Sequence, residues 1–179
     1  MKDNGTVKLK AALFDLDGVI FDTEPQYTNF WRSQCQLYHP EISGLENVIK
    51  GQTLVQIYDN YFDDVKDQQP LITQRLNEFE QTMSFPFIDG VEAFIMDLRA
   101  HGIKTVVVTS SNVVKMNNVY AQHPNFKSLF DRILTSEDFS ASKPDPDPYL
   151  KGAECVGAKP EECAGFEDSF NGLKSVRSA

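Results

Sequence analysis

The chain has 179 residues, of which 41% are hydrophobic and 24% are charged, proportions that are ordinary for a globular protein. Its 17 basic and 26 acidic residues give a formal net charge of −9, which argues against a nucleic-acid backbone or an anionic membrane as the main partner. No apolar run approaches the length of a membrane span, and the three cysteines lack the spacing of a disulfide framework, so we expect a cytoplasmic protein.

The first predicted element is a short strand over residues 10–15, because the apolar run AALF is typical of a strand buried on both faces. Asp15 stands at its C-terminal tip, Asp17 follows two residues later, and Gly18 permits a tight turn. Two carboxylates this close repel each other, and neither is expected to be well solvated at the end of a buried strand. A bound cation would relieve the repulsion, so this segment predicts a metal site.

The next segment, residues 24–86, has the periodicity of helices. Apolar side chains recur at three- and four-residue steps in three stripes, formed by Tyr27, Phe30, Trp31, Cys35 and Tyr38, by Leu54, Ile57, Tyr58, Tyr61, Phe62 and Val65, and by Ile72, Leu76, Phe79 and Met83. Stripes of this kind favour a helix–helix core over a cofactor pocket. We therefore predict a small helical bundle inserted after the first strand.

The remaining chain alternates between helix and strand. The predicted helices cover residues 90–101, 112–122, 148–156 and the segment from about 169 onward, and the predicted strands cover residues 103–109, 132–135 and 163–167. This alternation is typical of a parallel sheet covered by helices on both faces. The predicted fold class is therefore α/β: a Rossmann-like, doubly wound parallel sheet core, residues 1–23 and 87–179, with the helical bundle as an insertion.

Polar side chains gather at the predicted ends of these strands, where a doubly wound sheet binds its ligands. They are Asp15, Asp17, Thr109, Ser110, Ser111, Lys143, Glu167 and Asp168. Carboxylates suit Mg²⁺, while hydroxyl groups, amides and a single lysine suit a phosphate. The set predicts metal-assisted phosphoryl transfer.

Four segments make a family resemblance specific: DLDGVIFDTEP, VVVTS, SKPDPDPY and GFEDSFNG, in this order. They resemble the four motifs of the haloacid dehalogenase superfamily, in its phosphatase and β-phosphoglucomutase-like branch. The resemblance runs from about residue 10 to the last residue. It implies that the helical insertion is a cap, hinged near residues 23–25 and 86–90, that closes over the bound phosphate.

The resemblance also implies roles for the motif residues. Asp15 would be the nucleophile that forms an aspartyl phosphate, and Asp17 would be the general acid and then the general base. Asp17 must be protonated when the substrate arrives, and we expect its negative neighbours to favour that state while the metal works against it. Thr109, through its hydroxyl, and Ser110, through its amide, would bind phosphoryl oxygens, and Lys143 would neutralise phosphate charge and pair with the nucleophile.

The implied cofactor is Mg²⁺. It would be held by the Asp15 carboxylate, the Asp17 backbone carbonyl and Asp168, with Glu167 in support. In the cap, residues 50–53 resemble the loop that reaches toward the substrate in the mutase branch, so Lys50 is a predicted substrate contact. Glu24 either meets the substrate or caps the first cap helix.

Three functions stay open. The β-phosphoglucomutases carry a histidine early in the first cap helix and an arginine after the cap-loop glycine, where this chain has Tyr27 and Leu54. The missing cation favours a Mg²⁺-dependent phosphatase, acting as a monomer on a small phosphorylated metabolite such as a sugar phosphate, over a mutase. A non-catalytic phosphate-binding or receiver-like protein is the third alternative, and Asp17 and the cap argue against it.

In this family a further strand and a closing helix follow the fourth motif, whereas this sequence ends at Ala179. We expect that strand and helix to be missing from the core, either because the chain is a fragment or because the fold is trimmed. The strand at residues 163–167 would then be a sheet edge, and a version extended by one strand and one helix would be more stable.

Overall fold

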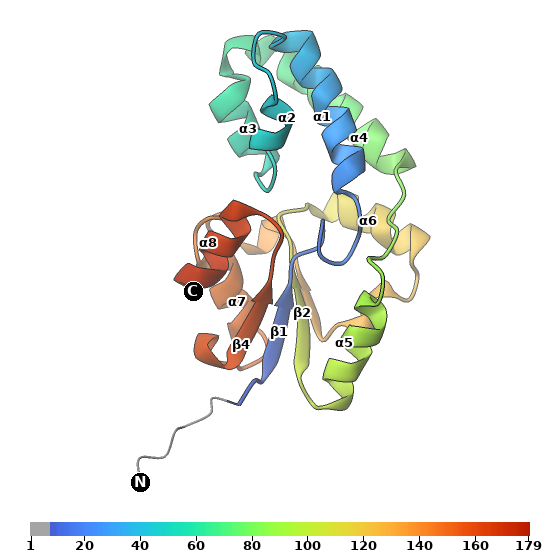
Figure 1. Ribbon diagram of the computed structural model, residues 1–179, viewed down its shortest axis with the longest axis vertical. Coiled ribbons are helices and arrows are strands. Elements are labelled where there is room, and N and C mark those ends of the chain that lie inside the picture. The colour runs from blue at the N-terminus through green and yellow to red at the C-terminus, as the bar shows by residue number, and fades with distance from the viewer. Residues whose placement is uncertain (1–7) are drawn as a thin grey trace.

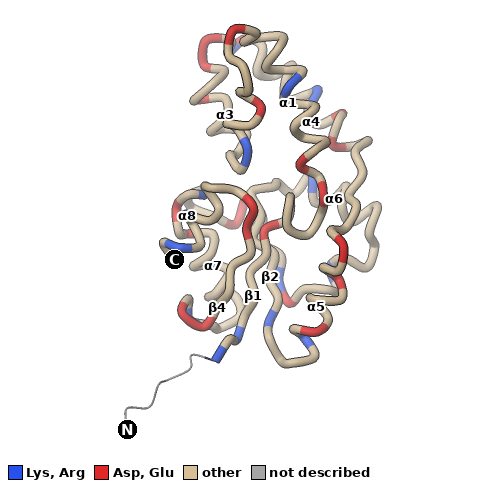
Figure 2. Tube along the Cα trace, in the orientation of Figure 1, with Lys and Arg blue, Asp and Glu red and all other residues tan. Residues whose placement is uncertain are grey.

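The computed structural model describes residues 8–179, so residues 1–7 of the predicted core segment 1–23 lie outside the described residues. A sheet layer carries helices on both sides, and a separate group of helices stands over one end of the strands (Figure 1). Acidic and basic residues are interspersed along the chain in both parts (Figure 2). Within residues 8–179, no helix has both the length and the apolarity that a membrane crossing requires.

The sheet has four parallel strands in the order β3-β2-β1-β4. Their bounds are β1 (Ala11–Phe14), β2 (Lys104–Val108), β3 (Arg132–Leu134) and β4 (Cys163–Phe166). In the register, Leu13 of β1 lies between Val106 and Gly165 of its two neighbours. Since the chain passes from β1 to β2 and β3 on one side and returns to β4 on the other, the strand order reverses at β1, where such sheets bind ligands.

Both faces of the sheet are covered, which confirms the predicted doubly wound α/β fold. Side chains alternate along β1: Ala12 and Phe14 enter one apolar core, and Ala11 and Leu13 enter the other. The first core is closed by α5 (Val91–Ala100) and α6 (Val113–Gln122), and the second by α7 (Asp147–Glu154) and α8 (Phe170–Ser178). Double coverage explains why the strands are continuous apolar runs. Short 3₁₀ helices complete this layer: η2 (Phe126–Leu129), η3 (Ser136–Asp138) and η4 (Pro160–Glu162).

Within the described residues, β4 pairs with β1 alone and forms an edge of the sheet, as expected. All four of its residues are partly exposed, in contrast to the fully buried β1. The greater stability of an extended chain stays a prediction.

The helical insertion consists of α1 (Glu24–Tyr38), α2 (Leu45–Val48), α3 (Leu54–Tyr61), η1 (Asp63–Gln68) and α4 (Gln69–Thr82). It has an apolar core of its own, in which Phe62 and Ile72 are fully buried and Trp31 packs against Phe62 with ring centroids 6.1 Å apart. The three predicted stripes face this core except at Met83, which packs into the core of the sheet layer, so the stripes serve apolar packing as predicted.

Two chain segments connect the insertion to the sheet, and they lie side by side. Asp22 N donates to Pro86 O at 2.9 Å and Ile88 N donates to Ile20 O at 2.9 Å, while Phe21 and Phe87 form an antiparallel bridge. The second connection falls within the hinge predicted at residues 86–90, and the first ends just before the hinge predicted at residues 23–25. That they act as hinges stays a prediction.

Candidate active site

The turn after β1 brings the first and the last motif together. Ile20 N and Phe21 N both donate to Leu16 O, at 2.9 and 3.0 Å, which folds the chain back on itself. Gly18 stands in this turn with a φ of +73°, and a Cβ at this position would lie 2.0 Å from Asp168 Oδ2. Glycine therefore permits both the turn and the close approach of Asp168.

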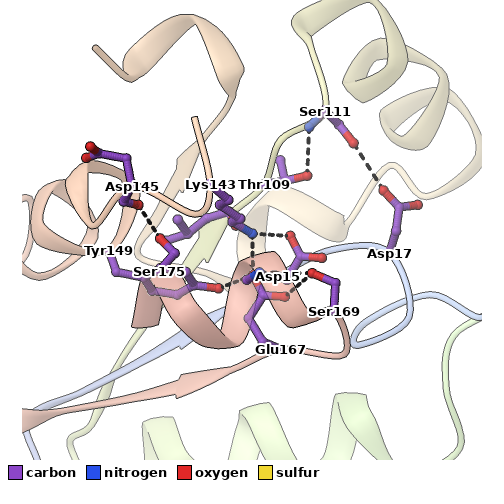
Figure 3. A network of polar contacts seen from close by, with 12 residues as sticks. Asp15, Asp17, Thr109, Ser111, Lys143, Asp145, Tyr149, Glu167, Ser169 and Ser175 are labelled. Carbon is purple, nitrogen blue, oxygen red and sulfur yellow. Dashed lines mark hydrogen bonds and ion pairs between the residues drawn. The ribbon is translucent and has the colours of Figure 1, made fainter. Parts of the chain in front are cut away.

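Lys143 is the centre of a buried polar cluster beside Asp15 (Figure 3). Its Nζ donates to Asp15 Oδ1 at 2.8 Å, to Glu167 Oε1 at 2.5 Å and to Val108 O at 3.0 Å. Tyr149 OH donates to the same Glu167 oxygen at 2.6 Å. All three ammonium donors thus have an acceptor, which is the condition under which a buried lysine is tolerated.

Two carboxyl groups at this end of the sheet, Asp15 and Asp168, have raised pKa values. Burial, opposed by the Lys143 ammonium and reinforced by the charges of Glu167 and Asp17, raises the pKa of Asp15 to about 7. Burial, together with the negative charge of Glu24 and Glu167, raises the pKa of Asp168 to about 6. Burial is the main cause of both shifts and neighbouring carboxylates add to it, so a bound cation would favour the ionised forms.

Three carboxylates can hold that cation. Asp15, Glu167 and Asp168 each offer an oxygen, and these atoms lie within 4.8 Å of one another. Carboxylate oxygens at this spacing fit Mg²⁺, which is usually held by one or two carboxylates. Since one Glu167 oxygen already accepts from Lys143 and Tyr149, Asp15 and Asp168 are the better ligands and Glu167 the better support.

Asp17 has a different environment from Asp15. Its Oδ2 accepts from Lys115 Nζ at 2.5 Å and from Ser111 Oγ at 3.1 Å, and its Oδ1 accepts from Thr23 Oγ1 at 2.6 Å. Burial raises the pKa of this carboxyl, but the charge and hydrogen bond of Lys115 outweigh it and leave the pKa below its ordinary value. The expectation that negative neighbours favour protonated Asp17 is therefore wrong, because a cation that was not foreseen lies against it.

The predicted phosphate-binding residues lie on the same side of the sheet. Thr109 is 1% exposed, and its Oγ1 accepts from Ser111 N at 3.0 Å, which curls the loop after β2 around the strand end. Thr109 and Ser110 both face the cavity between sheet and insertion. The hydroxyl of Thr109 keeps its own proton available for a phosphoryl oxygen.

The cavity has a volume of about 1420 Å³ and lies between the insertion and the carboxyl ends of the strands. Eight of the nine predicted site residues line it: Asp15, Asp17, Glu24, Lys50, Thr109, Ser110, Lys143 and Asp168. Glu167 is not among the lining residues, since its side chain is 1% exposed behind Lys143.

The insertion reaches the sheet layer through the loop before α3. A Cβ at Gly51, whose φ is +71°, would lie 2.5 Å from Ser169 Oγ, and Gln56 Nε2 donates to Lys143 O at 3.0 Å. Lys50 in this loop pairs with Glu24 at 3.1 Å. Glu24 is the first residue of α1, so it stands both at a helix start and in the cavity wall.

Two residues of the site were not predicted, Lys115 and Tyr149, and Ser111 was expected at the strand end but without its contact to Asp17. The prediction of a single lysine is corrected to two, Lys115 and Lys143. Lys115 lies four residues before buried Val119, but a lysine beside an apolar stripe is usually a solvated edge, so only the packing of α6 against Asp17 identifies it. Tyr149 ends the third motif, but only the contact of its hydroxyl with Glu167 distinguishes it from a core aromatic.

Comparison with known proteins identifies a family that this chain matches. The family model of haloacid dehalogenase-like hydrolases matches residues 9–179. The bifunctional riboflavin kinase/FMN phosphatase of Arabidopsis thaliana is 24% identical over 188 residues, which cover 98% of this chain and 48% of that protein, so the chain spans about half its length. The fructose-1-phosphate phosphatase of Escherichia coli is 22% identical over 178 residues, which cover 93% of this chain and 90% of that enzyme.

Among solved structures, a β-phosphoglucomutase from Clostridium difficile matches with a TM-score of 0.76 and 23% sequence identity, over 95% of this chain and 81% of that chain. At this identity the likeness supports the fold: a Rossmann-like sheet with an inserted helical unit.

Proposed function

The chain belongs to the haloacid dehalogenase-like hydrolases, and we propose that it is a Mg²⁺-dependent phosphatase that cleaves a small phosphate monoester through an aspartyl phosphate. One observation carries the proposal: Asp15, at the end of the central strand, lies against buried Lys143 and within metal-binding distance of Asp168, on the floor of the cavity. A nucleophile, a phosphate-neutralising cation and a metal site thus share one point.

The residues divide the work as follows. Asp15, Asp168 and the Asp17 backbone carbonyl would hold Mg²⁺, which shields phosphate charge and polarises the phosphoryl oxygens. Thr109 and Ser110 bind a phosphoryl oxygen through a hydroxyl and an amide. Lys143 supports the Asp15 carboxylate and neutralises charge on the phosphoryl group.

The chemistry proceeds in two displacements. In the first, Asp17 must carry a proton, although Lys115 outweighs burial and holds its pKa below the ordinary value. An Asp15 oxygen forms a bond to phosphorus while the bond to the leaving oxygen breaks, and Asp17 gives that oxygen its proton. In the second, Asp17 takes a proton from a water molecule that attacks phosphorus, and the bond to Asp15 breaks. Phosphate leaves, Asp15 is again a carboxylate and Asp17 is again protonated.

The charges of the cavity favour a phosphatase over a mutase, which must hold two phosphates. Its lining contains three cations, and each is already paired: Lys50 with Glu24 at 3.1 Å, Lys115 with Asp17 at 2.5 Å and Lys143 with Asp15 at 2.8 Å. Among the described lining residues, no cation remains for a second phosphate. The charges of the cavity lining therefore suit a monophosphate whose leaving group is uncharged.

We propose a phosphorylated sugar or a similar polyol as the substrate. The side of the cavity formed by the insertion carries the amide side chains of Asn47 and Asn77, which can hydrogen-bond hydroxyl groups. One relative acts on fructose 1-phosphate by its name, and another on FMN. The insertion, residues 24–86, would be the cap that excludes water and reads the leaving group.

The proposal is tested by phosphate release from a panel of sugar phosphates, FMN and p-nitrophenyl phosphate, with and without Mg²⁺. We expect release that requires Mg²⁺ and is lost in Asp15→Asn. Conversion of β-glucose 1-phosphate to the 6-phosphate in the presence of a bisphosphate primer would favour the mutase instead. Turnover that persists in Asp15→Asn would contradict the nucleophile.

A further inference from the structure

A second buried lysine lies in the site without a role in the chemistry described above. Lys115 projects from α6, is 4% exposed, and places its Nζ 2.5 Å from Asp17 Oδ2. A lysine is almost never this buried unless it is paired, because its charge loses solvation. The ion pair with Asp17 is therefore the contact that stabilises Lys115 in this buried position.

Lys115 also contacts the insertion. Its Nζ stands over the ring of Tyr27 in α1, 4.5 Å from the centroid. Tyr27 OH donates to Glu80 Oε1 of α4 at 2.8 Å, and Glu80 is 7% exposed. The backbone oxygen of Glu80 accepts from Asn118 Nδ2 of α6 at 3.2 Å. One helix of the sheet layer thus touches Asp17 on one side and both long helices of the insertion on the other.

The Asp17 carboxylate is fixed from three elements at once. Thr23, at the start of α1, holds Oδ1, while Ser111, after β2, and Lys115 hold Oδ2. Lys115 is the charged member of this set, and charge-assisted hydrogen bonds are roughly twice as strong as neutral ones. Removing it leaves two hydroxyl donors to orient the carboxylate.

We propose that Lys115 is a positioning residue for Asp17: it holds the carboxylate where the leaving oxygen arrives and ties that position to the insertion through Tyr27 and Glu80. The inference rests on the proposed function, in which Asp17 handles the proton of the leaving group. Correct orientation matters there because general acid–base catalysis contributes about 10²- to 10⁴-fold and depends on hydrogen-bond reach. A supporting residue outside the reacting set typically contributes about 10- to 100-fold.

The test uses two esters with different leaving groups. A sugar phosphate needs a proton on its alkoxide, whereas the phenolate of p-nitrophenyl phosphate leaves without much help. We expect Lys115→Met to lower kcat for the sugar phosphate about 10- to 100-fold with little change in KM, and to lower kcat for the aryl ester far less. Lys115→Arg should recover part of the loss.

A double variant shows whether Lys115 acts through Asp17. If it does, Asp17→Asn with Lys115→Met should turn over p-nitrophenyl phosphate about as fast as Asp17→Asn alone, since the group being positioned is already lost. Equal losses for both esters, or losses that multiply in the double variant, would overturn the proposal and make Lys115 a structural residue.

Two controls separate the possible failures. Lys127→Met removes a lysine that also stands over a tyrosine, Tyr120 at 4.0 Å, but away from the cavity, and should leave kcat unchanged. Thermal unfolding is measured first, and Lys115→Gln replaces Lys115→Met if the latter does not fold. If the parent releases no phosphate from any ester, the proposed function fails, whereas an active parent with equal losses in Lys115→Met refutes only the positioning role.

Discussion

Replacing Lys143 by methionine should destabilise the metal-free protein more than any other single change in the site. The substitution keeps most of the apolar side chain but leaves Asp15, 9% exposed, and the Glu167 side chain, 1% exposed, without their shared cation. Removing one partner of a buried ion pair destabilises a protein by about 3–5 kcal/mol. For a chain of this size, that corresponds to a fall in the unfolding temperature of about 6–20 °C.

The assay is thermal unfolding of the parent and Lys143→Met, followed by circular dichroism with EDTA and again with excess MgCl₂. Since Asp15 and Glu167 repel each other once the lysine is gone, a divalent cation should bind the variant's carboxylates more favourably. We therefore expect MgCl₂ to raise the unfolding temperature of Lys143→Met by more than it raises that of the parent.

Lys151→Met is the matched control. Lys151 also pairs with an aspartate, Asp147 at 3.1 Å, but both side chains are partly exposed, so its loss should change stability by less than about 1 kcal/mol. The reasoning fails if Lys143→Met unfolds at the parent's temperature in EDTA. It also fails if MgCl₂ shifts both proteins equally, because lysine and metal would then not share the carboxylates.

Three further results are expected. Gly18→Ala should abolish Mg²⁺-dependent phosphate release, because its Cβ would lie 2.0 Å from Asp168 Oδ2 in a turn with positive φ; wild-type activity would refute this packing. Phe62→Ala, at a fully buried position in the insertion, should lower the free energy of unfolding by about 3–5 kcal/mol in urea denaturation, and a loss below about 1 kcal/mol would show that the insertion has no tight core. Asp131→Asn should lower stability by about 1–2 kcal/mol at neutral pH. Burial acts to raise the pKa of Asp131, but the Lys104 ammonium and a backbone N–H outweigh it and lower that pKa. The difference in stability between parent and variant should therefore persist above pH about 4 and disappear as the pH falls through the lowered pKa. A stability difference that grows in acid would contradict this assignment.

The strand-end residues of the site were accessible to sequence reasoning for a physical reason. Asp15 and Thr109 directly follow apolar runs that form buried strands, Glu167 and Asp168 follow the edge strand β4, and parallel strands end at the same edge of a sheet. Lys143 lies in a loop, where its motif rather than any periodicity marked it. The family match and the parallel sheet bear out the fold that follows from these patterns.

Other parts of the site depend on packing that a single sequence does not express. Lys115 belongs to a helix, and a lysine next to an apolar stripe is usually a solvated edge, so only the placement of α6 against Asp17 shows that it is buried. The short helix α2 has a single buried residue, Leu45, and therefore no periodicity to detect. The lowered pKa of Asp17 was missed for the same reason as Lys115, since the second cation reverses the electrostatic argument.

The two lysines also explain why two neighbouring aspartates shift in opposite directions. Lys143 is shared between Asp15 and Glu167, so one cation serves two buried carboxylates and burial prevails at Asp15, raising its pKa. Lys115 meets Asp17 directly at 2.5 Å, and there the pairing prevails over burial and lowers the pKa.

With Asp168 included, four carboxylates face two ammonium groups, so the ionised site carries two negative charges in excess. A phosphate dianion would be repelled by such a site, whereas one divalent cation would balance it. Metal binding is thus expected to precede or accompany phosphate binding, and the nucleophile gains its ionised form from the same event that admits the substrate.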